Sequence, residues 1–215
     1  MRWGELAALQ WTNVHFDEPR LKVDPDVGAL HEIGGTLTLG PPKTSASVRT
    51  VHLPPFLAAL LYLHRQDHGD DQFVFTGTDG GLMRRSNFRN RVWIPAVEGA
   101  KTRGWAPLSP GLHFHDLRHT HKTWMIEDGI PEVAQARRLG HRQPGVRDIY
   151  SHVSQVMVDQ LLAGLQRRWE RTITTERQNT TESQMGSRSF APNVLPGQQN
   201  GPSAMIADEP CDQCV

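Results

Sequence analysis

Residues that could carry out chemistry gather in three short blocks of this sequence. The blocks are 2–6 (RWGEL), the histidine-rich run 113–121 (HFHDLRHTH), and 139–153, which contains the segments LGHR and DIYSHV. If the second block is helical, His115 and Arg118 share one face, because positions three apart on a helix are neighbours. Both side chains could then approach one ligand.

Tyr150, in the third block, is the candidate for tyrosine chemistry. Only two tyrosines occur, and Tyr62 lies in an apolar run that predicts a core position. A phenol with an unperturbed pKa of about 10 is a poor nucleophile at neutral pH, so it needs neighbouring groups that handle its proton. The simpler role for Tyr150, an aromatic core contact, stays open from the residue alone.

The histidine block also fits a zinc site. His115 and His119 are four apart with Asp116 beside them, superficially the pattern of a two-histidine zinc hydrolase. Arg118 would lie next to the metal, and its charge would repel a dication. We therefore rank this alternative low and expect no metal or other cofactor.

Taken in order, these blocks resemble the tyrosine recombinases, that is, the phage-type integrases and their transposon relatives. The matching features are the block 2–6, a lysine at position 43 in a turn, the His115–Arg118 pair, Leu139-Gly140-His141 and Tyr150. The resemblance covers about residues 1–165. Each motif alone is weak, whereas their joint order is a strong signal.

The resemblance implies a metal-free transesterification on double-stranded DNA. Tyr150 would attack a backbone phosphate, form a 3′-phosphotyrosine and release a 5′-hydroxyl. Arg2 and Arg118 would hold the charged phosphate oxygens, as guanidinium groups do well. Lys43 would protonate the leaving oxygen as general acid.

Three further residues complete the site that the resemblance implies. His115 would assist proton transfer at the tyrosine hydroxyl, and His141 would hydrogen-bond a phosphate oxygen. Glu5 would support an arginine without joining the chemistry. Taken singly, Arg2 and Lys43 could be solvated surface residues, and His141 could cap a helix C-terminus.

Charge adds a candidate DNA-binding segment. The net charge is zero, but residues 84–103 hold six cations against Glu98 alone. Such density suits a polyanion, although a solvated helix face would look the same. The six candidate DNA-binding residues are Arg84, Arg85, Arg89, Arg91, Lys101 and Arg103.

The pattern of the chain predicts an α+β fold, mostly helical, with a small antiparallel three-stranded sheet near the N-terminus. We expect helices at 1–10, 56–66, 85–98, 115–128, 131–139 and 153–170. Strands are expected at 14–16, 20–23, 35–39 and 47–53, the last two joined by a turn that places Lys43 near a hairpin tip. Residues 1–171 would form one catalytic domain and residues 172–215, rich in polar residues, a disordered tail.

The hydrophobic pattern and the first residues also predict where the protein is located. No apolar run approaches the roughly 20 residues of a membrane span, and the first residues do not read as a signal peptide, so we expect a cytoplasmic, nucleoid-associated protein. The two cysteines, Cys211 and Cys214, read as an incidental terminal pair.

Family members carry an N-terminal helical domain ahead of the first arginine block, so the resemblance implies a catalytic domain that lacks it. Two functions stay open: a strand-transferring enzyme, or a truncated, catalytically inactive DNA-binding remnant. The resemblance also implies self-assembly on DNA, typically as a tetramer. Leu161, Leu162, Leu165 and Trp169 form a stripe that could dock on a neighbouring subunit or pack in cis.

Overall fold

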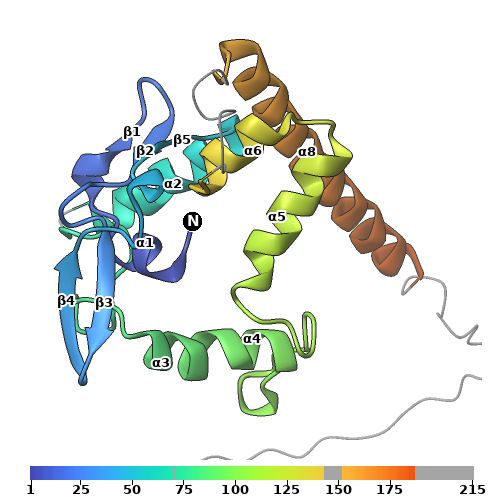
Figure 1. Ribbon diagram of the computed structural model, residues 1–215. Coiled ribbons are helices and arrows are strands. Elements are labelled where there is room, and N and C mark those ends of the chain that lie inside the picture. The colour runs from blue at the N-terminus through green and yellow to red at the C-terminus, as the bar shows by residue number, and fades with distance from the viewer. Residues whose placement is uncertain (70, 143–151, 187–215) are drawn as a thin grey trace, which may run out of the picture. The chain divides into compact units, whose positions relative to one another are not determined.

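The computed structural model describes residues 1–69, 71–142 and 152–186, with side chains up to residue 175. The chain divides into a compact unit, Met1–Ile173, and a second unit, Thr174–Val215. The first unit contains all the elements described below except the end of the last helix (Figure 1).

Two small antiparallel sheets form the N-terminal part. Strands β1 (Val14–His15), β2 (Arg20–Lys22) and β5 (Thr50–His52) make a three-stranded sheet in the order β1-β2-β5. Strands β3 (Ala29–Ile33) and β4 (Thr36–Gly40) form a separate hairpin. The predicted three-stranded sheet is therefore confirmed, although its strand partners differ from those expected.

The expected hairpin between residues 35–39 and 47–53 is wrong, and so is the predicted place of Lys43 at its tip. β4 pairs with β3 through a turn at Gly34 and Gly35, whose φ angles of 57° and 81° suit glycine. β5 pairs instead with β2. Lys43 therefore lies in the connection that leads from one sheet to the other.

The helices follow the predicted segments with shifted ends. The predicted helix at 1–10 is only five residues long, because Leu9 and Trp11 leave the helix to hydrogen-bond the segment 72–74. The bounds are α1 Trp3–Ala7, α2 Pro55–His68, α3 Arg85–Phe88, α4 Ile94–Glu98, α5 Asp116–Glu127, α6 Glu132–Leu139 and α8 Gln155–Gly186.

Helices α3 and α4 are joined by a π turn, Arg89–Trp93, and form one rod (Figure 1). Pro95, at the start of α4, lacks the N–H that would bond the carbonyl of Arg91, and its ring crowds that carbonyl. The Arg91 carbonyl instead accepts a hydrogen bond from Arg103 Nη1 at 3.0 Å. The proline thus explains the wider turn in this basic segment.

The start of α8 packs in cis. Leu161 and Leu165 are buried with Met125 of α5, with Ile130 just before α6, and with Leu139 at the end of α6. This apolar cluster accounts for most of the predicted docking stripe.

The aromatic end of the stripe packs in cis as well. Trp169 stacks on Phe56 at the start of α2, with ring centroids 4.7 Å apart and an interplanar angle of 9°. The backbone N–H of Phe56 also donates to Gln166 Oε1 at 2.9 Å. The stripe is thus core within the unit Met1–Ile173.

Helix α8 also corrects the predicted tail. It runs for 32 residues to Gly186, so residues 172–186 are helical where the composition predicted disorder. This stretch contains neither proline nor glycine before Gly186, and a formed helix extends at little cost through such residues. In the described part of the chain, no helix has the length and apolarity to cross a membrane.

Close packing of α1 on β3 leads to a stability prediction. A Cβ added at Gly4 would lie 2.8 Å from the carbonyl oxygen of Leu30, a backbone atom that cannot swing aside. We expect Gly4→Ala to lower the free energy of unfolding by about 1–3 kcal/mol, measured by urea denaturation. Gly81→Ala is the control, because its new Cβ would meet nothing closer than 3.7 Å. Equal losses in both variants would contradict the packing argument.

Candidate active site

Arg2 lies immediately before α1 and is held from two directions. Its Nη1 donates to Glu5 Oε1 at 3.0 Å and to Ser47 Oγ at 2.8 Å, and its backbone N–H donates to Glu5 Oε2 at 3.0 Å. The side chain is 29% exposed, so the guanidinium also faces solvent. The first turn of α1 thereby orients Arg2 through a residue of its own helix.

Glu5 is a buried carboxylate between two guanidinium groups. Its side chain is 3% exposed, and Oε2 accepts a hydrogen bond of 2.9 Å from Nη2 of Arg49, whose side chain is fully buried. Burial alone would raise the pKa of Glu5, but the hydrogen bond and charge of Arg49, with the contacts of Arg2, bring the pKa below its ordinary value. Glu5 is therefore ionised at neutral pH. Glu5 therefore contacts Arg2, the residue that it was expected to support.

Arg49 was not among the predicted site residues. Beyond Glu5, its Nη1 donates to the carbonyl of Ser47 at 2.6 Å and its Nε to the carbonyl of Arg138 at 2.8 Å. One buried side chain thus joins α1, the 3₁₀ turn Ser45–Ser47 and the end of α6. The sequence did hold a signal: in the alternating run 47–53, residues 47, 49, 51 and 53 share one face, and all four are buried.

Arg118 reaches the turn after α6. The residue is 8% exposed, and its Nη2 donates to the Leu139 carbonyl and, at 3.1 Å, to His141 Nε2. Burial, with the charges of Arg2 and Arg49, lowers the pKa of Arg118 to about 10, so the group stays cationic at neutral pH. Its Nη1 is buried and has no hydrogen-bond partner in the described structure. An anion is the natural partner for such a donor.

The turn at Gly140 brings together Arg2 and Arg118, the two residues expected to hold the phosphate, which we call the clamp. Gly140 ends α6 in the left-handed conformation, with φ 67°, and an added Cβ would lie 2.8 Å from Arg49 Nη1. Arg118 donates to the carbonyl of Leu139, and Arg2 Nη2 lies 3.5 Å from that of Gly140. Two guanidinium groups distant in sequence therefore converge on consecutive carbonyls of one turn.

His141 follows this turn and is exposed. Partial burial of the ring, then the charges of Arg118 and Arg2, lower the pKa of His141, which favours the neutral ring at neutral pH. Since Nε2 accepts from Arg118, the proton of the neutral ring lies on Nδ1.

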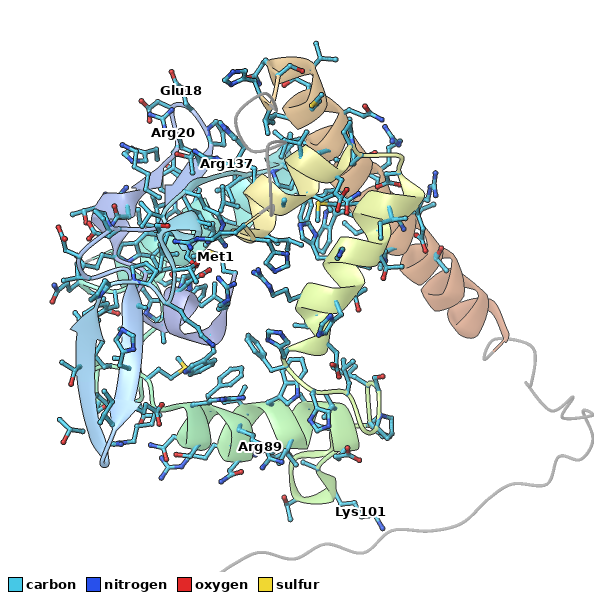
Figure 2. The ribbon with its side chains drawn as sticks, viewed as in Figure 1. Met1, Glu18, Arg20, Arg89, Lys101 and Arg137 are labelled. Atoms are coloured by element: carbon cyan, nitrogen blue, oxygen red, sulfur yellow. The ribbon has the colours of Figure 1, made fainter. Side chains whose placement is uncertain are left out.

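His115 stands at the N-cap of α5, with its ring 5.1 Å from that of His119. Burial, then the charges of His119 and Arg118, lower the pKa of His115. His115, Arg118 and Met1, which is labelled in Figure 2, line a hollow of about 150 Å³. The structure thus brings together Arg2, Glu5, His115, Arg118 and His141.

Two predicted residues stand apart from this cluster. Lys43 is exposed, and within the described structure it forms no hydrogen bond or ion pair. Tyr150 lies outside the described residues, as do Cys211 and Cys214. Tyr62, expected in the core, is instead 54% exposed on α2, with one edge contact to Phe16.

The six basic residues of 84–103 extend along the α3–α4 rod and the loop after it. Arg85, Arg89, Arg91, Lys101 and Arg103 are exposed, and Lys101 projects from the outer edge of the segment in Figure 2. Arg84 is half-buried, and its Nη2 donates to the carbonyl of Gly35 at 2.6 Å. Five of the six side chains are therefore exposed enough to contact a polyanion.

The zinc alternative gains no support from this geometry. Within the described ranges, no group of three or more His, Cys, Asp or Glu side chains could hold a metal ion. Arg118 is directed to the turn at Gly140, where its charge adds to those of Arg2 and Arg49. Three guanidinium groups against the single carboxylate of Glu5 leave a cationic site, which suits a phosphate better than a metal.

Residues 1–156 match the model of the phage integrase family. The chain is similar to the integrase of Mycobacterium phage L5, with 29% identity over 161 residues, 72% of this chain and 41% of the relative. A tyrosine recombinase XerC-like protein of Caldanaerobacter subterraneus subsp. tengcongensis is 29% identical over 174 residues, 71% of this chain and 42% of the relative. The chain thus spans about two fifths of the length of these relatives.

The fold is similar to a solved structure of the Tn1549 transposon integrase in complex with a circular intermediate DNA. The TM-score is 0.55, with 18% sequence identity, and the match covers 78% of this chain and 54% of that chain. This similarity supports the predicted α+β fold.

The environment of Glu5 leads to a pH-dependent prediction. Glu5→Gln removes the charge that balances Arg49, and loss of one partner of a buried ion pair costs about 3 kcal/mol. The pKa of Glu5 is lower in the folded protein than its ordinary value of 4.5. The contribution of the Glu5 charge to the free energy of unfolding is therefore complete above pH 4.5 and is lost as the pH falls through the folded-state pKa. The stability gap between wild type and Glu5→Gln, measured by urea denaturation, should therefore be full at pH 7 and narrow below pH 4.5.

An exposed ion pair is the control for this experiment. Glu18 pairs with Arg20 at the surface, where Glu18 is 76% exposed, so Glu18→Gln should change stability by less than about 1 kcal/mol. A gap for Glu5→Gln that stays constant from pH 7 to pH 3 would contradict the ionised state of Glu5.

Proposed function

The chain belongs to the phage integrase family, as its residue blocks predicted, and on that premise we propose that it cleaves and rejoins DNA in site-specific recombination. The intermediate would be a 3′-phosphotyrosine. The observation that carries the proposal is the convergence of Arg2 and Arg118 on the turn at Gly140, with Arg118 Nη1 buried and unpartnered. A scissile phosphate is an anion of the right kind for that donor.

The two arginines would act on the phosphate. In the transition state of attack, negative charge increases on the non-bridging oxygens, and fixed guanidinium groups stabilise that charge without reorganising. Burial strengthens the effect for Arg118, because the surrounding dielectric is low. Glu5 and Arg49 would keep Arg2 in place.

Proton transfer would involve the residues around this clamp. Tyr150 Oη would form the new bond to phosphorus while the bond from phosphorus to the 5′-oxygen breaks. His115, neutral at pH 7 because its pKa is lowered, would accept the phenol proton. Lys43 would donate a proton to the departing 5′-oxygen. His141 would orient Arg118 and donate to a phosphate oxygen, and no metal or cofactor is required.

DNA would lie along the exposed cations of 84–103 as well as in the clamp. Contacts of this kind neutralise backbone phosphates and hold the duplex without reading its sequence. The proposal also includes self-assembly of this chain on DNA, which the family resemblance implies.

Covalent trapping tests the nucleophile. A DNA duplex nicked near the cleavage site loses the short 5′-hydroxyl fragment, so the covalent intermediate accumulates and shifts the protein on a denaturing gel. We expect the adduct with wild type and a loss of at least 1,000-fold with Tyr150→Phe, which lacks the attacking oxygen. Tyr62→Phe is the matched control and should form adduct at the wild-type rate.

The possible outcomes separate the two functions. Adduct that survives Tyr150→Phe would rule out this nucleophile. DNA binding without adduct in wild type would instead favour the inactive, DNA-binding alternative.

The salt dependence of DNA affinity tests the basic segment. The logarithm of the association constant K for DNA falls linearly as the logarithm of the salt concentration rises. Removing a side chain that contacts a phosphate should make this slope less steep by about 0.9. We therefore expect Arg89→Ala and Lys101→Ala each to reduce the slope by about one, in fluorescence anisotropy with duplex DNA. Arg167→Ala, at an exposed arginine of α8, should leave it unchanged. Equal slopes for all these proteins would remove 84–103 from the interface.

A further inference from the structure

We infer that the buried hydroxyl of Ser47 is the positioning group for Lys43, linking the Arg2 guanidinium to the segment that carries this lysine. The inference rests on the proposed function, in which Lys43 is the general acid. Ser47 was not among the residues predicted from the sequence. It touches no proposed reacting atom, so it would act through Lys43.

Ser47 occupies a fully enclosed position, with 0% exposure. Its Oγ accepts the hydrogen bond of 2.8 Å from Arg2 Nη1 and forms a second, of 3.0 Å, with Thr44 Oγ1. A hydroxyl can make both contacts because it has two lone pairs and one proton. The result is a chain of side chains from Arg2 through Ser47 to Thr44, the residue next to Lys43.

The backbone around this chain is fixed as well. The N–H of Ser47 donates to the Thr44 carbonyl at 3.0 Å, and the Ser47 carbonyl accepts from the buried Arg49 at 2.6 Å. On the other side, Arg142 Nη2 donates to Ser45 Oγ at 2.8 Å, so the turn after α6 also holds this segment. The connection between the two sheets is thereby attached to both sides of the clamp.

Lys43 depends on these attachments for its position. Its own side chain is exposed and makes no hydrogen bond or ion pair among the described residues, so its position depends on the backbone on either side. After it, Thr44 is held through Ser47, and before it, the Pro41 carbonyl lies 3.0 Å from His31 Nε2. Pro41 and Pro42 precede it and restrict the backbone on that side. A phosphate bound by Arg2 would thus lie at a defined distance from Lys43. Loss of the Ser47 hydroxyl would free the lysine without removing it.

The chemistry of the leaving group allows a specific test. When the bond from phosphorus to the 5′-oxygen breaks, the electron pair goes to oxygen, and a proton from Lys43 Nζ avoids a strongly basic alkoxide. A sulfur atom in place of that oxygen leaves as a thiolate, whose conjugate acid has a pKa of about 8.5, far below the pKa of an alcohol. Cleavage of the sulfur substrate therefore needs no general acid.

The experiment compares single-turnover cleavage of a nicked oxygen substrate and its 5′-bridging phosphorothiolate analogue by wild type, Lys43→Ala, Ser47→Ala and Thr44→Ala. We expect Ser47→Ala and Thr44→Ala to be at least 10-fold slower than wild type on oxygen, and within about threefold of it on sulfur. Lys43→Ala should lose more of the cleavage rate on the oxygen substrate than these two variants, and its rate should likewise recover on the sulfur substrate. Arg118→Lys, which alters the clamp, should remain slow on both substrates.

The outcomes distinguish the inference from the proposed function. If Lys43→Ala recovers on sulfur while Ser47→Ala and Thr44→Ala are equally slow on both substrates, their role is merely structural and the inference is overturned. The inference is also overturned if Ser47→Ala and Thr44→Ala both cleave the oxygen substrate at the wild-type rate. If the cleavage rate of Lys43→Ala does not recover on the sulfur substrate, or if wild type cleaves neither substrate, the proposed function is wrong. The inference, which rests on it, is then wrong as well. Should Ser47→Ala not fold, as seen by circular dichroism, Thr44→Ala decides alone.

Discussion

The ion pair between Glu5 and Arg49 is the interaction on which the rest of the site depends. Arg49 has no exposed side-chain area, and a guanidinium cannot shed its proton at neutral pH, so its charge must be balanced inside the protein. Glu5 provides that balance and at the same time binds Arg2. The same carboxylate thus makes burial of one arginine possible and orients another toward solvent.

Arg49 also determines which segments meet. Its three donor nitrogens bond α1, the turn Ser45–Ser47 and the end of α6, which come from widely separated parts of the chain. Gly140 is required beside it, since a side chain there would collide with the guanidinium. Packing around one planar group therefore sets the distance between Arg2 and the turn that holds Arg118 and His141.

An aromatic cluster connects the basic segment to this site. The ring of Phe88, at the end of α3, contacts the rings of Trp3, Trp93 and Phe114. The ring of Phe114 also contacts those of Trp3 and Trp93, and the centroids in this cluster are 4.9–6.4 Å apart. Trp3 follows Arg2, and Phe114 precedes His115. Contacts of these large rings contribute beyond their buried area, so the exposed cations are held at a defined place relative to the clamp.

Local sequence signals predicted much of this molecule. Helical periodicity located α2, α5 and α6 within a few residues, because the apolar spacing of a helix is written in neighbouring positions. The order of the residue blocks predicted the family, and the residues 2, 5, 115, 118 and 141 do lie together. Predicting these features required no knowledge of the tertiary contacts between elements.

The tertiary structure decided what depends on distant partners. Strand periodicity gives a strand but not its neighbour, so the pairing of β4 with β3, and hence the place of Lys43, followed from turn geometry and packing. Arg49 and Ser47 read as ordinary strand residues, although their alternation with Val51 already marked an inward face. Only the fold supplies the carboxylate of Glu5 that lets such a charge stay buried, because a buried ion needs a partner that the local sequence does not contain.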